Sequence, residues 1–174
     1  MSQPKPPQPA KLVIGVFTSD KRLLGTIISR LTELFGTIEV MSPVIPFDYT
    51  DYYEPEMGPN LVRRMIAFKP LIAQDTLSTI KLKTNILENE FSKDARRNVN
   101  IDPGYLVRER FVLATGKNFT HRIYVGNNIY ADLTLIFQKG EFKSLPWTYP
   151  DYKEKNMHAF LYRVRNKYIK DLNQ

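Results

Sequence analysis

The sequence contains no cysteine and only two histidines, His121 and His158. The absence of cysteine excludes disulfide bonds, a thiol nucleophile and metal sites built on thiolates. Two histidines are also too few for a zinc site that uses several of them. A bound metal would therefore be a hard ion held by carboxylate oxygens, such as Mg²⁺, Mn²⁺ or Ca²⁺.

Long apolar stretches are missing as well. No run approaches the roughly 20 apolar residues of a membrane-spanning helix, and residues 1–10 lack the apolar core of a signal peptide. We therefore expect a cytoplasmic protein that does not enter a membrane. With 174 residues, 43% of them hydrophobic, the chain can bury the core of one domain. We expect a proline-rich, disordered arm at residues 1–10 and a single domain at residues 11–174.

The common glycine-rich nucleotide-binding motifs are absent from the sequence. A phosphate-cradling loop has the pattern Gly, four residues, Gly-Lys-Ser/Thr, which lets backbone N–H groups face the phosphates. The nearest match ends in Gly116-Lys117-Asn118, with Phe111 at the first glycine position and Asn118 in place of the hydroxyl residue. A nucleotide ligand would therefore have to be held by side chains.

Acidic residues are fewer than basic ones. The chain has 18 Asp and Glu against 25 Lys and Arg, which gives a net charge of +7. This balance favours anionic partners, namely an anionic small molecule, a nucleotide or RNA. An even scatter of Lys and Arg that serves only solubility is the alternative.

The carboxylates are concentrated in residues 47–60, FDYTDYYEPEMGPN, which we call the acidic loop. Its prolines and glycine oppose both helix and strand, so we expect an ordered loop that lines a ligand site or covers the sheet. Asp48, Asp51 and Glu56 are candidate ligands of a divalent ion such as Mg²⁺. Local ion pairs with the following Arg63-Arg64 are the alternative.

Hydrophobic periodicity predicts an α+β domain. Strands are predicted at residues 11–18, 37–44, 61–71 and 108–117, and helices at residues 20–36, 73–91 and 154–172. Asp20 is the predicted N-cap of the first helix, and Asp102-Pro103-Gly104 predicts a turn. We expect a mostly antiparallel sheet of six or seven strands, with its apolar face covered by the three helices in a ferredoxin-like arrangement.

Residues 119–145 have the pattern of a β-meander whose first turn is Gly126-Asn127-Asn128. A three-residue turn separates a polar from an apolar face, whereas a two-residue turn would mix them. It also places Arg122 opposite Asp132. The polar face then carries Thr120, Arg122, Tyr124, Tyr130, Asp132 and Thr134, and the core-facing side carries Phe119, His121, Ile123, Val125, Ile129, Ala131, Leu133 and Leu135.

Five strings resemble a prokaryotic domain-of-unknown-function family, number 4416: PAKLVIGVFT, PFDYTDYYEPEMG, NIDPGYL, HRIYVGNNIYADLTL and PWTYPDY. The resemblance covers nearly the whole chain. Members of that family often carry the label GTP-binding protein, and this label is all that the resemblance implies about function. The sequence has Asn128 where a second hairpin glycine is usual and Asp132 where Glu is usual.

These sequence patterns are compatible with three functions. The patterns do not identify a reaction. The first is binding of a phosphorylated ligand or nucleotide, with a divalent metal, between the acidic loop and the polar face of the meander. The second is an RNA-binding module that stacks unpaired bases on the sheet. The third is a structural protein with no ligand and a buried Arg122–Asp132 pair. The ligand-binding candidates are Arg122, Asp132, Tyr124, Tyr130, Lys81, Lys117, Asp102, Tyr52 and Trp147.

Overall fold

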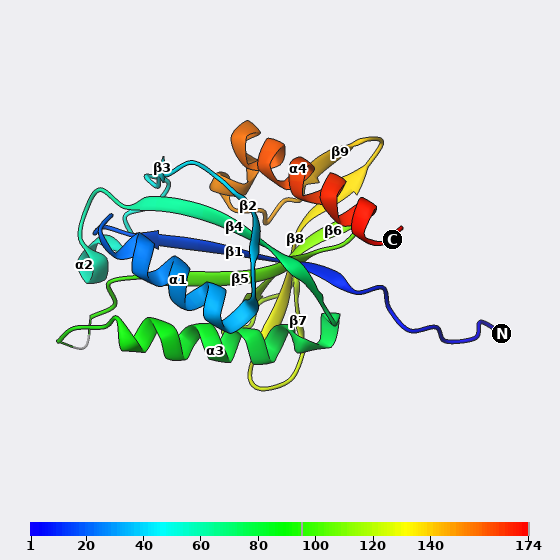
Figure 1. The fold of residues 1–174 in the computed structure, drawn as a ribbon, viewed down its shortest axis with the longest axis horizontal. Coiled ribbons are helices and arrows are strands. Elements are labelled where there is room, and N and C mark those ends of the chain that lie inside the picture. The colour runs from blue at the N-terminus through cyan, green and yellow to red at the C-terminus, as the bar shows by residue number, and fades with distance from the viewer. Residues whose placement is uncertain (95, 174) are drawn as a thin grey trace.

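The computed structural model describes residues 1–94 and 96–173, which form one α+β domain (Figure 1). Ala95 and Gln174, both inside the predicted domain, lie outside the described residues. The strands are β1 (Ala10–Thr18), β2 (Ile38–Met41), β3 (Ile45–Pro46), β4 (Val62–Ile72), β5 (Asn100–Leu106), β6 (Arg110–Thr115), β7 (Arg122–Tyr124), β8 (Tyr130–Gln138) and β9 (Glu141–Ser144). The α-helices are α1 (Leu23–Phe35), α2 (Glu54–Met57), α3 (Leu77–Glu90) and α4 (Lys155–Asp171), with 3₁₀ turns η1 (Gln74–Thr76) and η2 (Pro150–Lys153).

The described strands form one nine-stranded sheet in which neighbouring strands are antiparallel. The order is β2-β4-β1-β5-β6-β8-β7, with β3 beside β4 and β9 beside β8. β1 lies between β4 and β5, and all of its residues are buried, as its apolar sequence predicted. The mostly antiparallel sheet is thus confirmed, with more strands than expected.

Helices pack on both faces of the sheet (Figure 1). α1 and α3 cover the face that carries Leu12 and Ile14 of β1. α4 covers the opposite face, where Val13 and Met65 lie. The prediction that three helices cover one apolar face is therefore wrong, and the expected ferredoxin-like arrangement is not shown. Because β1 carries apolar side chains on both faces and is buried throughout, each face requires its own cover.

The first helix begins later than predicted. Its N-cap is Arg22 and not Asp20. The Asp20 carboxylate instead accepts hydrogen bonds from the backbone N–H of Arg22 at 3.0 Å and from its Nε at 2.9 Å, so it stabilises the turn before the helix. The predicted end is confirmed, because Gly36 follows Phe35 with a φ of 92°, a conformation that glycine adopts without strain.

Asp102-Pro103-Gly104 does not form a turn, because these residues lie within β5. Pairing between β5 and β6 begins at Gly104, so Pro103 stands at the end of that ladder, where a residue without an N–H is tolerated. A Cβ on Gly104 would lie 2.4 Å from the carbonyl oxygen of Val112. The glycine therefore permits close approach of two strands and not a change of direction.

The register of the first meander hairpin is confirmed. Arg122 pairs with Asp132 across β7 and β8, and Gly126-Asn127-Asn128 all have positive φ angles. The assignment of the apolar face to the core is wrong at this edge, where Phe119 and Ile123 are exposed. β7 is the last strand of the sheet, and neighbouring elements cover less of an edge strand than of a central one.

The acidic loop is ordered, but it contains the one-turn helix α2, which its prolines were predicted to exclude. Pro55 lies in the first turn of α2, where a backbone N–H has no partner within the helix, so its loss costs little. Phe47 anchors the loop by stacking on Phe17 of β1, with the ring centroids 4.6 Å apart. The loop is thereby held against the same sheet face as α4.

Candidate functional site

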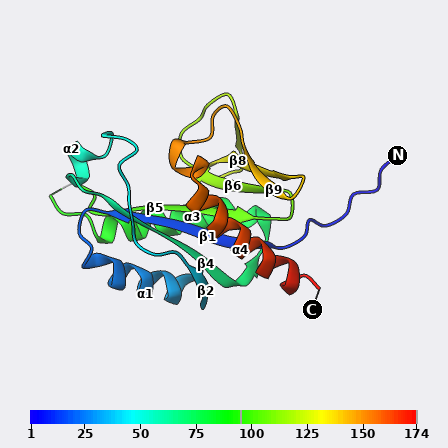
Figure 2. The same ribbon diagram turned by 90° about the horizontal axis from the view of Figure 1, so that it is seen from above.

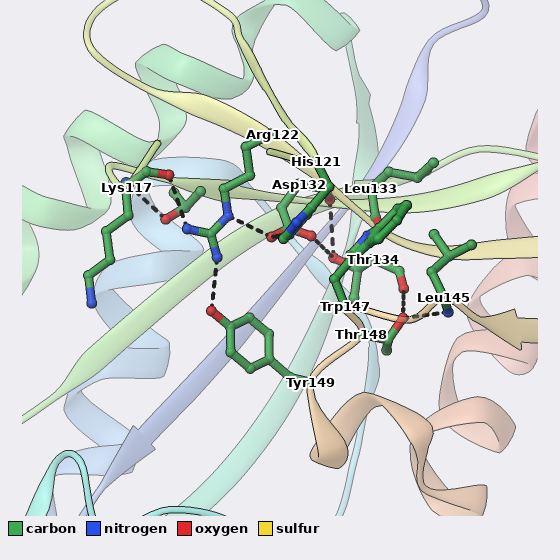
Figure 3. A network of polar contacts seen from close by, with 11 residues as sticks. Lys117, His121, Arg122, Asp132, Leu133, Thr134, Leu145, Trp147, Thr148 and Tyr149 are labelled. Atoms are coloured by element: carbon green, nitrogen blue, oxygen red, sulfur yellow. Dashed lines mark hydrogen bonds and ion pairs between the residues drawn. The ribbon is translucent and has the colours of Figure 1, made fainter. Parts of the chain in front are cut away.

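A buried ion pair joins the two strands of the β7–β8 hairpin (Figure 3). Arg122 Nε donates to Asp132 Oδ2 at 2.9 Å, and His121 Nε2 lies 3.1 Å from the same oxygen. Both partners of Asp132 are largely buried. His121 therefore belongs to a polar network and does not point into the apolar core as predicted.

The remaining nitrogens of the Arg122 guanidinium are also occupied. Nη1 donates to the carbonyl oxygen of Lys117 at 3.0 Å, and Nη2 donates to the Tyr149 hydroxyl at 2.9 Å (Figure 3). Burial is the largest single influence and opposes the guanidinium charge, but the hydrogen bonds and charges of Asp132 and Tyr149 together outweigh it and raise the pKa of Arg122. Arg122 thus holds other residues in position, and each of its guanidinium nitrogens already has a hydrogen-bond partner within the protein.

Residues 145–149 are attached to β8 by hydrogen bonds that the sequence did not indicate. Trp147 Nε1 donates to the carbonyl oxygen of Leu133 at 2.8 Å. Thr148 Oγ1 donates to the carbonyl oxygen of Thr134 at 2.6 Å. The Trp147 ring also stacks on His121, with the centroids 4.9 Å apart. These contacts (Figure 3) fix the tryptophan although it is partly exposed.

Four exposed aromatic side chains from three segments meet around this network, and we call them the aromatic surface. They are Tyr52 (63% exposed), Phe119 (63%), Trp147 (38%) and Tyr149 (50%). Lys117 links the acidic loop to this group, because its Nζ lies 3.1 Å from the Tyr52 hydroxyl and 4.7 Å from the centre of the Tyr52 ring. Predicted candidates Tyr52, Lys117, Arg122 and Trp147 therefore lie together.

Tyr124 and Tyr130 lie next to the Arg122–Asp132 pair along the hairpin. They are paired across β7 and β8, and their rings meet edge to face with centroids 5.5 Å apart. Tyr124 is exposed and Tyr130 is half-buried. These two candidates share the face of Arg122 but lie toward the hairpin turn.

Lys81 and Asp102 belong to a separate network on β5. Lys81 Nζ donates to the carbonyl oxygen of Ile101 at 2.8 Å and lies 3.7 Å from Asp102. Glu88 accepts the backbone N–H of Ile101, and burial raises the pKa of its carboxyl group. Both α3 side chains are buried, and each contacts the backbone of β5. Lys81 and Glu88 thus provide hydrogen-bond partners for the backbone of Ile101, in the part of β5 that does not pair with β6.

The predicted metal ligands are divided between two places. Asp48 and Asp51 line an open cavity of about 640 Å³ beside the acidic loop. Glu56 lines a different cavity and is held by Arg97, whose Nη2 lies 2.6 Å from Glu56 Oε2. This hydrogen bond lowers the pKa of Glu56. Residues 1–94 and 96–173 contain no group of three or more acidic or histidine side chains placed to hold a metal ion.

The partners of Arg63 are what sequence reasoning missed. It is 2% exposed and pairs with Asp151, while its Nη2 donates to the Tyr152 hydroxyl at 2.6 Å. Burial disfavours its charge, but Tyr152 and Asp151 together raise the pKa of Arg63 overall. Its neighbour Arg64 donates to the carbonyl oxygen of Ser42. Arg63 thus pairs with η2, and the ion pairs of Arg63-Arg64 with the acidic loop are not formed.

The arrangement defines a class: an α+β domain with a solvent-facing aromatic surface, one tyrosine of which is held by a largely buried arginine side chain, in a sequence without a phosphate-cradling loop. No helix in the described part of the chain is both long and apolar enough to cross a membrane. The chain belongs to the family described as Domain of unknown function (DUF4416), which matches residues 8–168. Neither a curated protein nor a solved structure matches it significantly.

Proposed function

We propose that the aromatic surface binds a phosphorylated ligand with a planar base, such as a nucleotide. The observation that carries the proposal is that Tyr52, Tyr149 and Trp147 border one polar network, through Lys117, Arg122 and His121 respectively. Exposed aromatic rings that cluster on a protein are typical of binding sites. Stacking of one base on such a ring contributes about 1–3 kcal/mol.

The rings are held in place before a ligand arrives. Tyr149 is fixed through its hydroxyl by Arg122, and Trp147 is fixed through its indole N–H by Leu133. Side chains that are already ordered lose little conformational freedom on binding, which favours affinity. The internal Arg122–Asp132 pair therefore contributes to the proposed site by positioning Tyr149 and not by contacting the phosphate.

Lys117 is the proposed phosphate contact, because it is exposed and its ammonium group already lies over the Tyr52 ring. The carboxylates of the acidic loop would repel a phosphate group. A divalent ion such as Mg²⁺ at Asp48 and Asp51, which line one cavity, would offset this repulsion. The proposal therefore includes stronger binding in the presence of Mg²⁺.

The test is a fluorescence titration, because Trp147 is the only tryptophan in the chain. GTP, ATP, GMP and AMP would each be added with and without Mg²⁺. A base that stacks on the aromatic surface should quench Trp147 emission in a saturable manner. Lys117→Ala should weaken binding about tenfold or more, since a hydrogen bond to a charged group contributes about 1.5–3 kcal/mol.

Lys83→Ala is the matched control, because Lys83 is an exposed lysine of α3, on the opposite side of the sheet. This variant should bind as tightly as the unchanged protein. The proposal is wrong if no nucleotide at millimolar concentration alters Trp147 emission. It is also wrong if the two lysine variants lose affinity equally, because the effect would then reflect net charge alone.

Single-stranded RNA is the second ligand to be tested. The exposed side of α4 carries Arg163, Lys167 and Lys170, and α4 lies on the same sheet face as η2. A strand that stacks on the aromatic surface would follow this basic helix with its backbone. Its affinity would then fall steeply as salt increases, whereas a single nucleotide would show a much weaker dependence.

A further inference from the structure

We propose that the proline-rich arm at residues 2–9 of one molecule docks on the aromatic surface of a second copy. The inference uses the surface assigned under the proposed function, but it does not depend on the ligand assigned there. The arm has the sequence SQPKPPQP, in which four of the eight residues are proline. Such a segment favours the polyproline II conformation, which has three residues per turn and leaves its carbonyl groups without internal partners.

The arm is anchored at its base and exposed along its length. The Tyr168 hydroxyl donates to the carbonyl oxygen of Pro9 at 2.7 Å, and Gln74 Nε2 donates to that of Gln8 at 2.9 Å. β1 begins at the next residue, Ala10. Figures 1 and 2 show the arm leaving the domain at the end away from α2 and the acidic loop. It therefore points away from the aromatic surface of its own molecule.

The aromatic surface has the chemistry that proline-rich segments recognise. Polyproline II segments dock on grooves lined by aromatic side chains, because a proline ring packs flat on an aromatic ring. Tyr52, Trp147 and Tyr149 are exposed, and hydrogen bonds hold each of them in position. In the polyproline II conformation Pro4 and Pro7 share one edge of the arm, so two rings can contact the surface at once.

Charge complementarity favours this chain's own arm as the occupant. Lys5 lies in the middle of the proline run. Tyr52 of this surface belongs to the acidic loop, whose Asp48, Asp51 and Glu54 line one cavity together with a single cation, Lys21. Three carboxylates thus fall close together in a chain whose net charge is +7. With Lys5 directed to them, the arm carbonyls are free to accept a hydrogen bond from Lys117. Reciprocal exchange of two arms would close a symmetric dimer.

The first experiment measures self-association of the full chain by sedimentation equilibrium. We expect a concentration-dependent dimer that the double variant Pro4→Ala/Pro7→Ala dissociates at least tenfold more readily. Lys5→Glu and Asp51→Lys should each weaken the dimer about fivefold, and the combination of both should restore it. A matched control is Lys83→Glu on α3, which should leave the dimer unchanged.

A second experiment uses a synthetic peptide of residues 2–9 and monitors Trp147 emission. Saturable quenching that Tyr52→Ala abolishes supports the proposal. The Pro4→Ala/Pro7→Ala variant should bind nucleotides as tightly as the unchanged protein or more tightly, so failure of arm docking is distinguishable from failure of the proposed function. A protein that stays monomeric and does not respond to the peptide overturns the inference. A dimer that survives both proline substitutions also overturns it, and would point to another interface.

Discussion

Two arginines bind the same segment of this protein in the same chemical manner but at different depths. Arg63 pairs with the carboxylate of Asp151 and donates to the Tyr152 hydroxyl. Arg122 pairs with Asp132 and donates to the Tyr149 hydroxyl, three residues before Tyr152. Arg63 is enclosed between the Phe47 and Tyr152 rings, whereas the tyrosine that Arg122 holds faces solvent.

The Arg63–Asp151 pair stabilises the fold, whereas the Arg122–Asp132 pair positions an exposed side chain. The partners of Arg63 are both buried, so that network ends inside the protein and joins β4 to η2. The Arg122 network ends on the exposed ring of Tyr149, so it can hold that ring in position for a ligand. The two should therefore respond differently to substitution, Arg63 mainly in stability and Arg122 mainly in binding.

Arg63→Met should cause the largest loss of stability. It leaves the buried Asp151 carboxylate without its partner, which typically costs about 3–5 kcal/mol. The free energy of unfolding from urea titration measures this loss. The double variant Arg63→Met/Asp151→Leu should recover most of it, because replacement of a whole buried pair by apolar residues is often neutral. A loss below about 1 kcal/mol in the single variant would contradict a buried structural pair.

Arg122→Met should have a smaller effect on stability and a larger one on the proposed ligand. Asp132 keeps His121 and a contact with Thr134, so the expected cost is about 1–3 kcal/mol. Tyr149 loses its hydrogen bond and becomes free to rotate, so nucleotide affinity from Trp147 quenching should fall about tenfold.

The control for that substitution is Arg122→Lys. Lysine retains the charge beside Asp132 but lacks the planar fork that also reaches Tyr149. It should therefore recover part of the stability and little of the affinity. If Arg122→Lys restored affinity fully, charge alone would matter, and the positioning of Tyr149 by Arg122 would be contradicted.

The comparison also explains which features the sequence could predict. The Arg122–Asp132 pairing follows from the hairpin register, because Gly126-Asn127-Asn128 fixes which residues face each other only a few positions away. The end of α1 at Gly36 and the central position of β1 are similarly encoded by neighbouring residues.

Features that depend on distant segments could not be predicted. Asp151 lies 88 positions after Arg63, and no local pattern links the two. Asp102-Pro103-Gly104 has the composition of a turn, but its neighbours β1 and, from Gly104 onward, β6 hold it extended. Lys81 is predicted to bind a ligand, but its Nζ donates to the carbonyl oxygen of Ile101. That oxygen needs a side-chain partner only once β5 has formed, so the sequence does not reveal the contact.

The smallest effect is expected at Glu56, which pairs with Arg97 at the surface. The hydrogen bond from Arg97 lowers the pKa of Glu56 below its ordinary value of 4.5. A carboxyl group with a lowered pKa stabilises the folded state above pH 4.5, and this contribution disappears as the pH falls through the lowered pKa. Because the pair is partly exposed and screened by solvent, its contribution should be about 0.2–1 kcal/mol.

Glu56→Gln should therefore reduce the free energy of unfolding slightly at neutral pH and not at all in acid, as measured by urea titration across this range. High salt should abolish the difference, because it screens an exposed pair, whereas the loss in Arg63→Met should persist. Glu54→Gln is the matched control, since Glu54 is exposed in the same helix and lines the other cavity. If the stability lost in Glu56→Gln did not depend on salt, the Glu56–Arg97 pair would behave as a buried pair, like Arg63–Asp151, and the expectation of an exposed, screened pair would be contradicted.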